Sequence, residues 1–134
     1  MDISKVNQYV GLPYKNMGRD RSGLDCWGLI KIVYKEILGI ELWDIGEAYP
    51  DDWSFKGKDL FMENYQRQWE NVGEPQAWDV VLLQNGGTVV NHAGIVLNKK
   101  TFIHCTKAGV ALGGLRERPW KSYVAGFYRY KGKL

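Results

Sequence analysis

The chain has 134 residues, of which 45% are hydrophobic and 25% charged, and its formal net charge is +3. This length and composition are typical of one folded domain, residues 1–134, with its own hydrophobic core, and they exclude a disordered chain. Basic residues are scattered and no apolar run approaches the ~20 residues of a membrane helix, so we expect neither a nucleic-acid partner nor membrane insertion.

The N-terminal segment has neither the basic start nor the apolar run of a secretory signal peptide. We therefore expect a protein without a signal peptide, whose two cysteines remain free thiols in the reducing cytosol. The same segment predicts a short helix that is capped by Asp2 or Ser4 and ended by Gly11. Val6 and Val10 should lie on one side of this helix.

The segment from Ser22 to Gly39 predicts a helix that begins close to a cysteine. Its apolar residues recur at helical spacing, and Gly39 is a typical helix stop. These apolar residues are Cys26, Leu29, Ile30, Val33, Ile37 and Leu38. Asp25 can cap the helix N-terminus. Free backbone N–H groups and the helix dipole favour a thiolate in the first turn, which makes Cys26 a candidate nucleophile.

The middle of the chain predicts an irregular segment through Asp52 and then a second helix over residues 56–71, where large apolar side chains again recur at helical intervals. From Pro75 onward the pattern changes to strands. The predicted strands are Asp79–Gln84, followed by a turn at Asn85-Gly86-Gly87; Thr88–Leu97; Thr101–Val110, which bends near Gly109; and Val124–Tyr130. Helices followed by an antiparallel meander predict an α+β fold with helices packed on the sheet.

The chain contains two histidines, His92 and His104, and both lie on predicted strands. Side chains alternate along a strand, so Cys105 should point away from the face that carries His104. The two strands should pair as a hairpin that places both histidines on one face, although not directly opposite each other. If the Cys26 helix packs on that face, the three side chains converge as nucleophile, base and orienting group.

Residue types and spacing alone leave other interpretations open. A cysteine on an apolar helix stripe is usually a small buried hydrophobic residue, and a strand histidine is usually structural. A zinc site of two cysteines and two histidines is less favoured, because His104 and Cys105 point in opposite directions and cannot both join one tetrahedral site.

The segment from Gly11 to Tyr34, GLPYKNMGRDRSGLDCWGLIKIVY, resembles the start of the NlpC/P60 cysteine peptidases. It has a G-x-P-Y stretch, a glycine-bearing loop and then D-C-x-G-L at the opening of a helix. WDVVLL, NHAGIVL and FIHCTKAGV follow in the order and spacing of that family. The resemblance implies the family's papain-like α+β fold, with Cys26 as nucleophile, His92 as base and His104 as third triad member. Tyr14 resembles the family tyrosine beside the nucleophile.

Two positions depart from the common family pattern: Trp27 stands where many members have serine, and Trp78 where many have glycine. The tryptophan after the cysteine resembles the phage-tail branch of the family. The resemblance therefore implies other phage or prophage tail proteins as partners. It also implies a location in the virion tail, or in the bacterial cytoplasm before assembly.

The activity implied by the resemblance is hydrolysis of peptide bonds in peptidoglycan stem peptides through a thioester, with no cofactor and no metal. The Cys26 N–H group is the expected oxyanion donor, with help from Tyr14. Asp25 and Trp27 are expected beside the substrate, in a groove formed by exposed aromatic side chains. Two other functions stay open: a structural tail component without activity, and an amidase or acyltransferase that acts on another substrate.

Overall fold

The computed structural model describes residues 2–42, 69–84 and 92–132 of the chain. The elements in chain order are η1 (Ile3–Tyr9), β1 (Arg19–Asp20), β2 (Gly23–Leu24), α1 (Cys26–Val33), η2 (Tyr34–Leu38), β3 (Trp69–Val72), β4 (Val80–Leu83), β5 (His92–Val96), β6 (Thr101–Thr106), β7 (Gly109–Gly114), α3 (Trp120–Tyr123) and β8 (Val124–Tyr130). The described strands form a two-stranded ribbon, β1-β2, and a six-stranded antiparallel sheet in the order β3-β8-β4-β5-β6-β7. The predicted α+β fold is confirmed.

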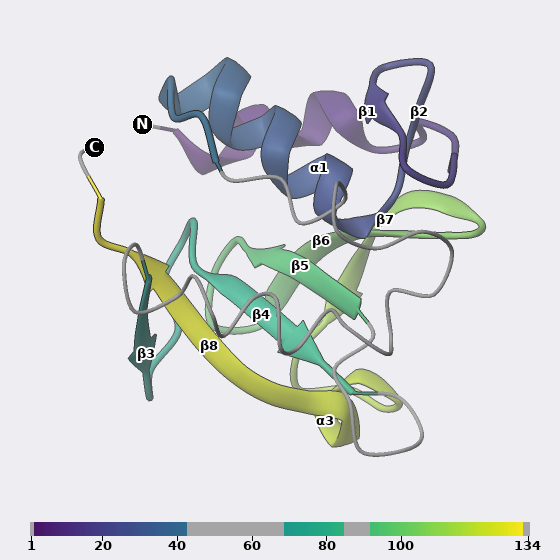
Figure 1. Cartoon of the computed structure of the whole chain (residues 1–134). Helices are drawn as coiled ribbons and strands as arrows, with labels where there is room; N and C mark the ends of the chain where they lie inside the picture. The colour runs from purple at the N-terminus through teal and green to yellow at the C-terminus, as the bar shows by residue number, and fades with distance from the viewer. Residues whose placement is uncertain (1, 43–68, 85–91, 133–134) are drawn as a thin grey trace.

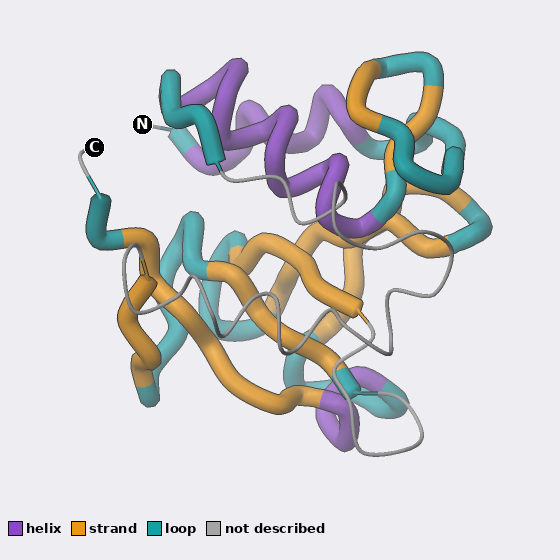
Figure 2. Tube along the Cα trace, in the orientation of Figure 1, coloured by secondary structure: helices purple, strands orange, loops and turns teal. Residues whose placement is uncertain are grey.

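Helices lie on both sides of the six-stranded sheet (Figures 1 and 2). The larger core lies between the sheet and α1 and includes Leu29, Ile30, Val33, Ala93, Ile95 and Ile103. The smaller core lies on the other face, beside α3, and includes Val81, Leu83, Val96 and Phe102, with Trp120 and Tyr123 packed against it. Neighbouring residues of β5 and β6 enter different cores because side chains alternate along a strand. None of the described helices has the length and apolar character needed to cross a membrane.

The N-terminal helix η1 is a 3-10 helix that is capped by Asp2, whose side chain accepts a hydrogen bond from the Ser4 N–H at 2.9 Å. Val6 and Tyr9 are its buried residues, whereas Val10 is 44% exposed. The prediction that Val10 shares a side with Val6 is wrong. A 3-10 helix has three residues per turn, so position 9 rather than position 10 aligns with position 6.

The cysteine helix begins at Cys26 and its predicted ends are confirmed. Asp25 accepts a hydrogen bond from the Gly28 N–H at 2.7 Å and so satisfies one of the free donors of the first turn. The helix continues as one π turn, η2, and stops at Gly39. Gly39 has φ 69°, a left-handed conformation that glycine adopts without steric cost.

The strand predictions agree with β4, β6 and β8, of which β8 has the predicted bounds, and with β5 over its described residues. The predicted strand at β7 is too short, because the strand continues past Val110 to Gly114 in its pairing with β6. The predicted second helix is wrong at its end, because Trp69 starts strand β3, which pairs with β8. The Trp69 ring is buried and packs on Tyr130 at 5.3 Å and on Tyr34 at 5.9 Å, so tertiary packing decides the local structure here. The rest of that helix (56–68), the irregular segment from 43 and the predicted turn at 85–87 lie outside the described residues.

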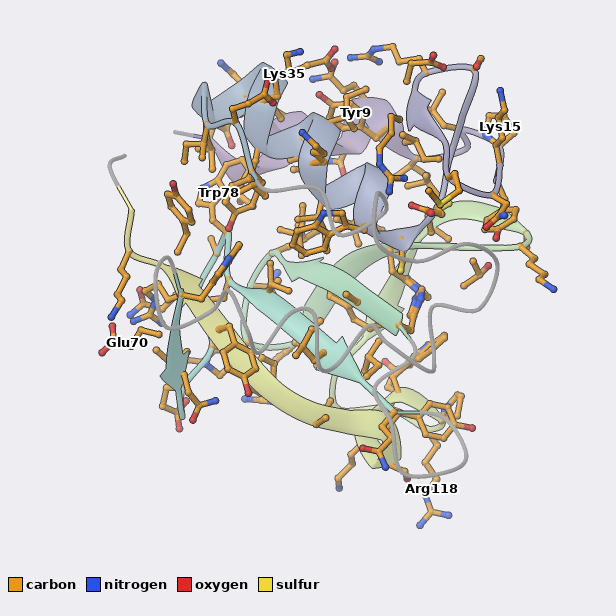
Figure 3. All side chains as sticks on the ribbon, viewed as in Figure 1. Tyr9, Lys15, Lys35, Glu70, Trp78 and Arg118 are labelled. Atoms are coloured by element: carbon orange, nitrogen blue, oxygen red, sulfur yellow. The ribbon has the colours of Figure 1, made fainter. Side chains whose placement is uncertain are left out.

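Trp78 adopts φ 78°, which explains why glycine is common at this position in the family it resembles. The surrounding structure holds the tryptophan in this conformation from two directions. Its N–H donates to the Val96 carbonyl at 2.9 Å, and its own carbonyl accepts a hydrogen bond from the Tyr34 hydroxyl. Figure 3 shows Trp78 beside the helices, on the far side of the sheet from Arg118.

Candidate active site

Asp25 ties the loop before α1 to the first turn of the helix. One carboxylate oxygen accepts from the Gly28 N–H at 2.7 Å and from Arg19 Nη1 at 2.8 Å, and the other accepts from the Met17 N–H at 3.2 Å. A Cβ at Gly28 would lie 2.0 Å from the Gly18 carbonyl oxygen. Any side chain at position 28 would therefore prevent the loop from packing on the helix. The start of α1, and with it Cys26, is therefore held in one place.

The Cys26 thiol is buried, with 6% of the residue exposed. Hydrogen bonds from the Ala93 and Trp27 N–H groups favour a thiolate, but burial and the charge of Asp25 outweigh them and raise the pKa of Cys26 to about 12. The prediction that the helix start makes Cys26 a resting thiolate is therefore wrong. The energetic cost of burying an anion exceeds the gain from the helix N-terminus, so the resting group is a neutral thiol.

His92 and His104 lie on one face of the sheet, as strand alternation predicts. The register places His104 opposite Gly94, so His92 is its diagonal neighbour, two residues away along β5. Nε2 of His92 lies 2.8 Å from Nδ1 of His104, which is hydrogen-bonding distance. The two imidazoles form one hydrogen-bonded pair although they are not directly opposed, which confirms both parts of the prediction.

Both imidazoles are uncharged at neutral pH. Burial lowers the pKa of His104 to about 4. Burial, and then the neighbouring imidazole of His104, lower the pKa of His92 to about 3. The hydrogen bond between the rings uses Nε2 of His92, so Nδ1 of that ring is the atom that remains for proton exchange with another group.

α1 packs on the sheet face opposite the histidines, so the condition for the predicted convergence of the three side chains is not met. The His104 ring contacts Phe102 and Trp120, both on the face away from α1. Cys26 instead approaches β5 at its first residues, where the Ala93 N–H, in the peptide group that follows His92, is close enough to its sulfur to favour the thiolate. In the part of the chain that the structure describes, no hydrogen bond joins this sulfur to an imidazole. The nucleophile candidate and His92 are thus both found at the start of β5.

Tyr14 lies close to the cysteine, as predicted. It forms a β-bridge with Leu24, directly before Asp25. Burial raises the pKa of its hydroxyl, with smaller contributions from the nearby Asp25 and from the thiols of Cys26 and Cys105. A neutral phenol in this place is a hydrogen-bond donor at every pH of interest.

Trp27 does not line a groove. It is 2% exposed and belongs to the core between α1 and the sheet, so the prediction of an exposed aromatic surface there is wrong. Cys105 points toward α1, away from His104, as predicted, and its thiol donates to the Leu24 carbonyl at 3.0 Å. Burial raises the pKa of Cys105 to about 11, so this thiol is also neutral.

Trp120, which the sequence pattern does not single out, has a ring that contacts both imidazoles. It belongs to α3, a helix of four residues that begins after Pro119. Such a short helix has no measurable periodicity, so the only local signal was a proline followed by a large aromatic residue just before the last strand.

Because both histidines are buried and neutral, we expect the free energy of unfolding to decrease in acid. In the unfolded chain both imidazoles have pKa values near 6.5, so the unfolded state takes up protons that the folded state, with values of about 3 and 4, does not. This contribution to stability is complete above about pH 6.5 and is lost as the pH falls toward 4. Urea unfolding of the wild type at pH 7, 6 and 5 should show this decrease. Replacing both histidines by glutamine should reduce it, and an equal decrease in this double variant would contradict the assignment.

Several known proteins are similar to this chain. The sequence model of the NlpC/P60 family matches residues 11–129. Tail tip assembly protein K of Escherichia phage N15 is 37% identical over 86 residues, which are 60% of this chain and 34% of that protein. Gamma-DL-glutamyl hydrolase of Bacillus subtilis is 30% identical over 96% of this chain and 28% of its own length. The probable peptidoglycan endopeptidase LytE of the same species is 25% identical over 96% of this chain and 33% of its own length.

Solved structures show the same fold. The NlpC/p60 domain of the peptidoglycan hydrolase SagA superposes with a TM-score of 0.63 at 21% identity, and the match covers 96% of each chain. The chain spans only about a third of the length of these three curated relatives.

Proposed function

Because the chain belongs to the NlpC/P60 family, we propose that it is a cysteine endopeptidase that hydrolyses peptide bonds in peptidoglycan stem peptides, with residues 1–134 acting as one catalytic domain. The observation that carries the proposal is the hydrogen-bonded pair of His92 and His104, at 2.8 Å, beside the strand start that the Cys26 sulfur contacts. Peptidoglycan endopeptidases are among the relatives of this chain, so the same class of substrate is the first candidate.

In the proposed reaction, His92 accepts the thiol proton while the Cys26 sulfur attacks the carbonyl carbon of the scissile bond. The resting groups are neutral, so this transfer accompanies substrate attack rather than preceding it. The oxyanion that forms is stabilised by the Cys26 N–H at the helix start, with the Tyr14 hydroxyl as a second donor. His92 returns its proton to the leaving amine, and a thioester remains.

Water completes the reaction. His92 removes a proton from a water molecule, the hydroxide attacks the thioester carbonyl, and the proton returns to the sulfur as the acid leaves. His104 holds the His92 ring through the Nε2–Nδ1 contact, so that Nδ1 of His92 points to the reacting groups. Asp25 contributes by fixing the helix start, through its bonds to Gly28 and Arg19.

We also propose that the protein acts in a phage or prophage tail. The support is its likeness to a tail tip assembly protein, 37% identical over 60% of this chain. Other tail proteins are then its partners, and the virion tail is its location. A tail that crosses a cell wall needs a local opening in that wall, which a stem-peptide endopeptidase would supply.

A second candidate function is hydrolysis of gamma-glutamyl bonds outside peptidoglycan. The likeness to Gamma-DL-glutamyl hydrolase favours it, because that match extends over 96% of this chain. The same thiol and imidazole pair serves both reactions, since each cleaves an amide through a thioester.

Mass spectrometry of digested peptidoglycan tests the proposal. Purified peptidoglycan and poly-gamma-glutamate are incubated with the protein in separate reactions, and the products are identified. We expect new peptide ends from peptidoglycan and none from poly-gamma-glutamate. The reverse pattern would favour the second candidate. Intact stem peptides after long incubation with folded protein would favour a structural role in the tail.

A further inference from the structure

The indole of Trp120 lies against both imidazoles of the pair. Its ring centre is 4.6 Å from that of His104, at an interplanar angle of 79°, and 6.3 Å from that of His92, at 29°. These are the edge-to-face and stacked arrangements that aromatic rings prefer. Trp120 is therefore in ring contact with both members of the proposed base and orienting pair.

The short helix that carries Trp120 is attached to the sheet. The Gln84 N–H at the end of β4 donates to the Tyr123 carbonyl at 2.7 Å, and Lys121 closes the helix turn on the Glu117 carbonyl at 2.9 Å. Trp120 also meets the ring of Phe102, a fully buried residue, at 5.6 Å. The indole is thus held in one place by the smaller core.

The His104 ring is enclosed from β7 as well. A Cβ at Gly113 would lie 3.3 Å from Nε2 of His104 and 2.6 Å from the Phe102 ring. The β7 backbone therefore approaches both rings as closely as a glycine permits. With Trp120 and Phe102 also against it, His104 is only 3% exposed, so water has little access to the hydrogen bond between its ring and His92.

We propose that Trp120 is a positioning residue for the proposed reaction: its indole keeps the His92 and His104 rings in their hydrogen-bonded arrangement and excludes water from them. The catalytic part of this inference rests on the proposed function, whereas the contact itself does not. Without the indole, water would compete for the ring nitrogens and the His92 ring could turn away from the reacting groups.

The histidine titrations test this inference without any turnover. The chain has two histidines, so its imidazole resonances in an NMR titration are two and readily assigned. The pKa values of about 3 and 4 have burial as their first cause, with the second imidazole added for His92, and no charged side chain in the described part of the chain contributes. In the wild type, neither ring should be protonated between pH 8 and 5.

In Trp120→Ala, we expect the pKa of at least one ring to rise above 5, toward 6.5, so that this ring titrates inside that range. Trp120→Phe keeps an aromatic ring and should stay close to the wild type. Tyr123→Ala is the matched control. It removes a ring from the same helix, and this ring contacts Trp120 but neither imidazole. If Trp120→Ala does not fold, the imidazole titrations are measured on Trp120→Leu instead. Unchanged titrations in a folded Trp120→Ala or Trp120→Leu protein would overturn the inference.

Kinetics supply the second readout on the same variants. Trp120→Ala should lower kcat about tenfold, as expected for a base that is less well aimed, and leave KM nearly unchanged. As the pH is lowered, the kcat/KM of this variant should begin to fall at a higher pH than that of the wild type. If the wild type cleaves nothing, the proposed function fails while the titrations still decide the role of Trp120. A normal kcat together with shifted titrations would overturn the positioning role.

Discussion

Replacing Cys26 by alanine is expected to abolish cleavage of peptidoglycan stem peptides, with a loss of about 10⁴-fold or more. Alanine leaves no atom that can form the thioester, and neither imidazole can substitute for it. The substitution should not disturb the fold, because alanine is a strong helix former and the Asp25 cap bonds to backbone N–H groups that remain. Mass spectrometry of the digestion products gives the measurement.

Cys105→Ser is the control for the loss of a buried thiol. Cys105 is 2% exposed, and its thiol donates to the Leu24 carbonyl, a bond that a serine hydroxyl can also make. Its side chain points away from the histidine pair, so we expect this variant to keep most of its activity. Equal losses in Cys26→Ala and Cys105→Ser would contradict the assignment of the nucleophile, since both would then act only through packing.

The parts of the fold that could be predicted are those set by local chemistry. The start of α1 and the end of η2 followed from Asp25 as a cap and Gly39 as a left-handed terminator, and both have those roles. The shared face of His92 and His104 followed from alternation along two strands joined by a short turn. Each of these predictions needs only neighbouring residues and one hairpin.

The parts that could not be predicted depend on contacts between distant segments. The local sequence pattern alone does not decide which sheet face α1 covers. In the structure, α1 covers the face opposite the histidines. The helical spacing of Trp69 was overridden by its packing against two tyrosines. The state of the Cys26 thiol depends on how deeply it is buried, which the sequence does not contain.

The contacts of Trp120 illustrate the same limit at the site itself. Nothing near Pro119 marks the tryptophan as different from the other aromatic residues of the chain. Only the folded arrangement brings α3 under the ends of β5 and β6, where the indole meets the histidine pair. Side chains that act by enclosing a site have no fixed spacing from the residues that they enclose.

His92→Ala is expected to lose about 10²–10⁴-fold in kcat, whereas His104→Gln should retain measurable activity. His92 is assigned the proton transfers of both halves of the reaction, and alanine removes them. Glutamine in place of His104 keeps a hydrogen-bonding group near Nε2 of His92, so the base remains but is aimed less well. Steady-state kinetics on both variants, with unfolding curves to show that each is folded, measure the difference.

The order of the two losses tests the assignment of roles, which the pair distance alone does not, since a 2.8 Å contact is symmetric. The asymmetry comes from position: His92 is the first residue of β5, next to the Ala93 N–H that the Cys26 sulfur contacts, whereas His104 is enclosed by Phe102 and Trp120. A ring so enclosed can support its partner but cannot approach a substrate. Greater activity in His92→Ala than in His104→Gln would mean that the roles are exchanged, and equal, complete losses would indicate that the pair works as one unit.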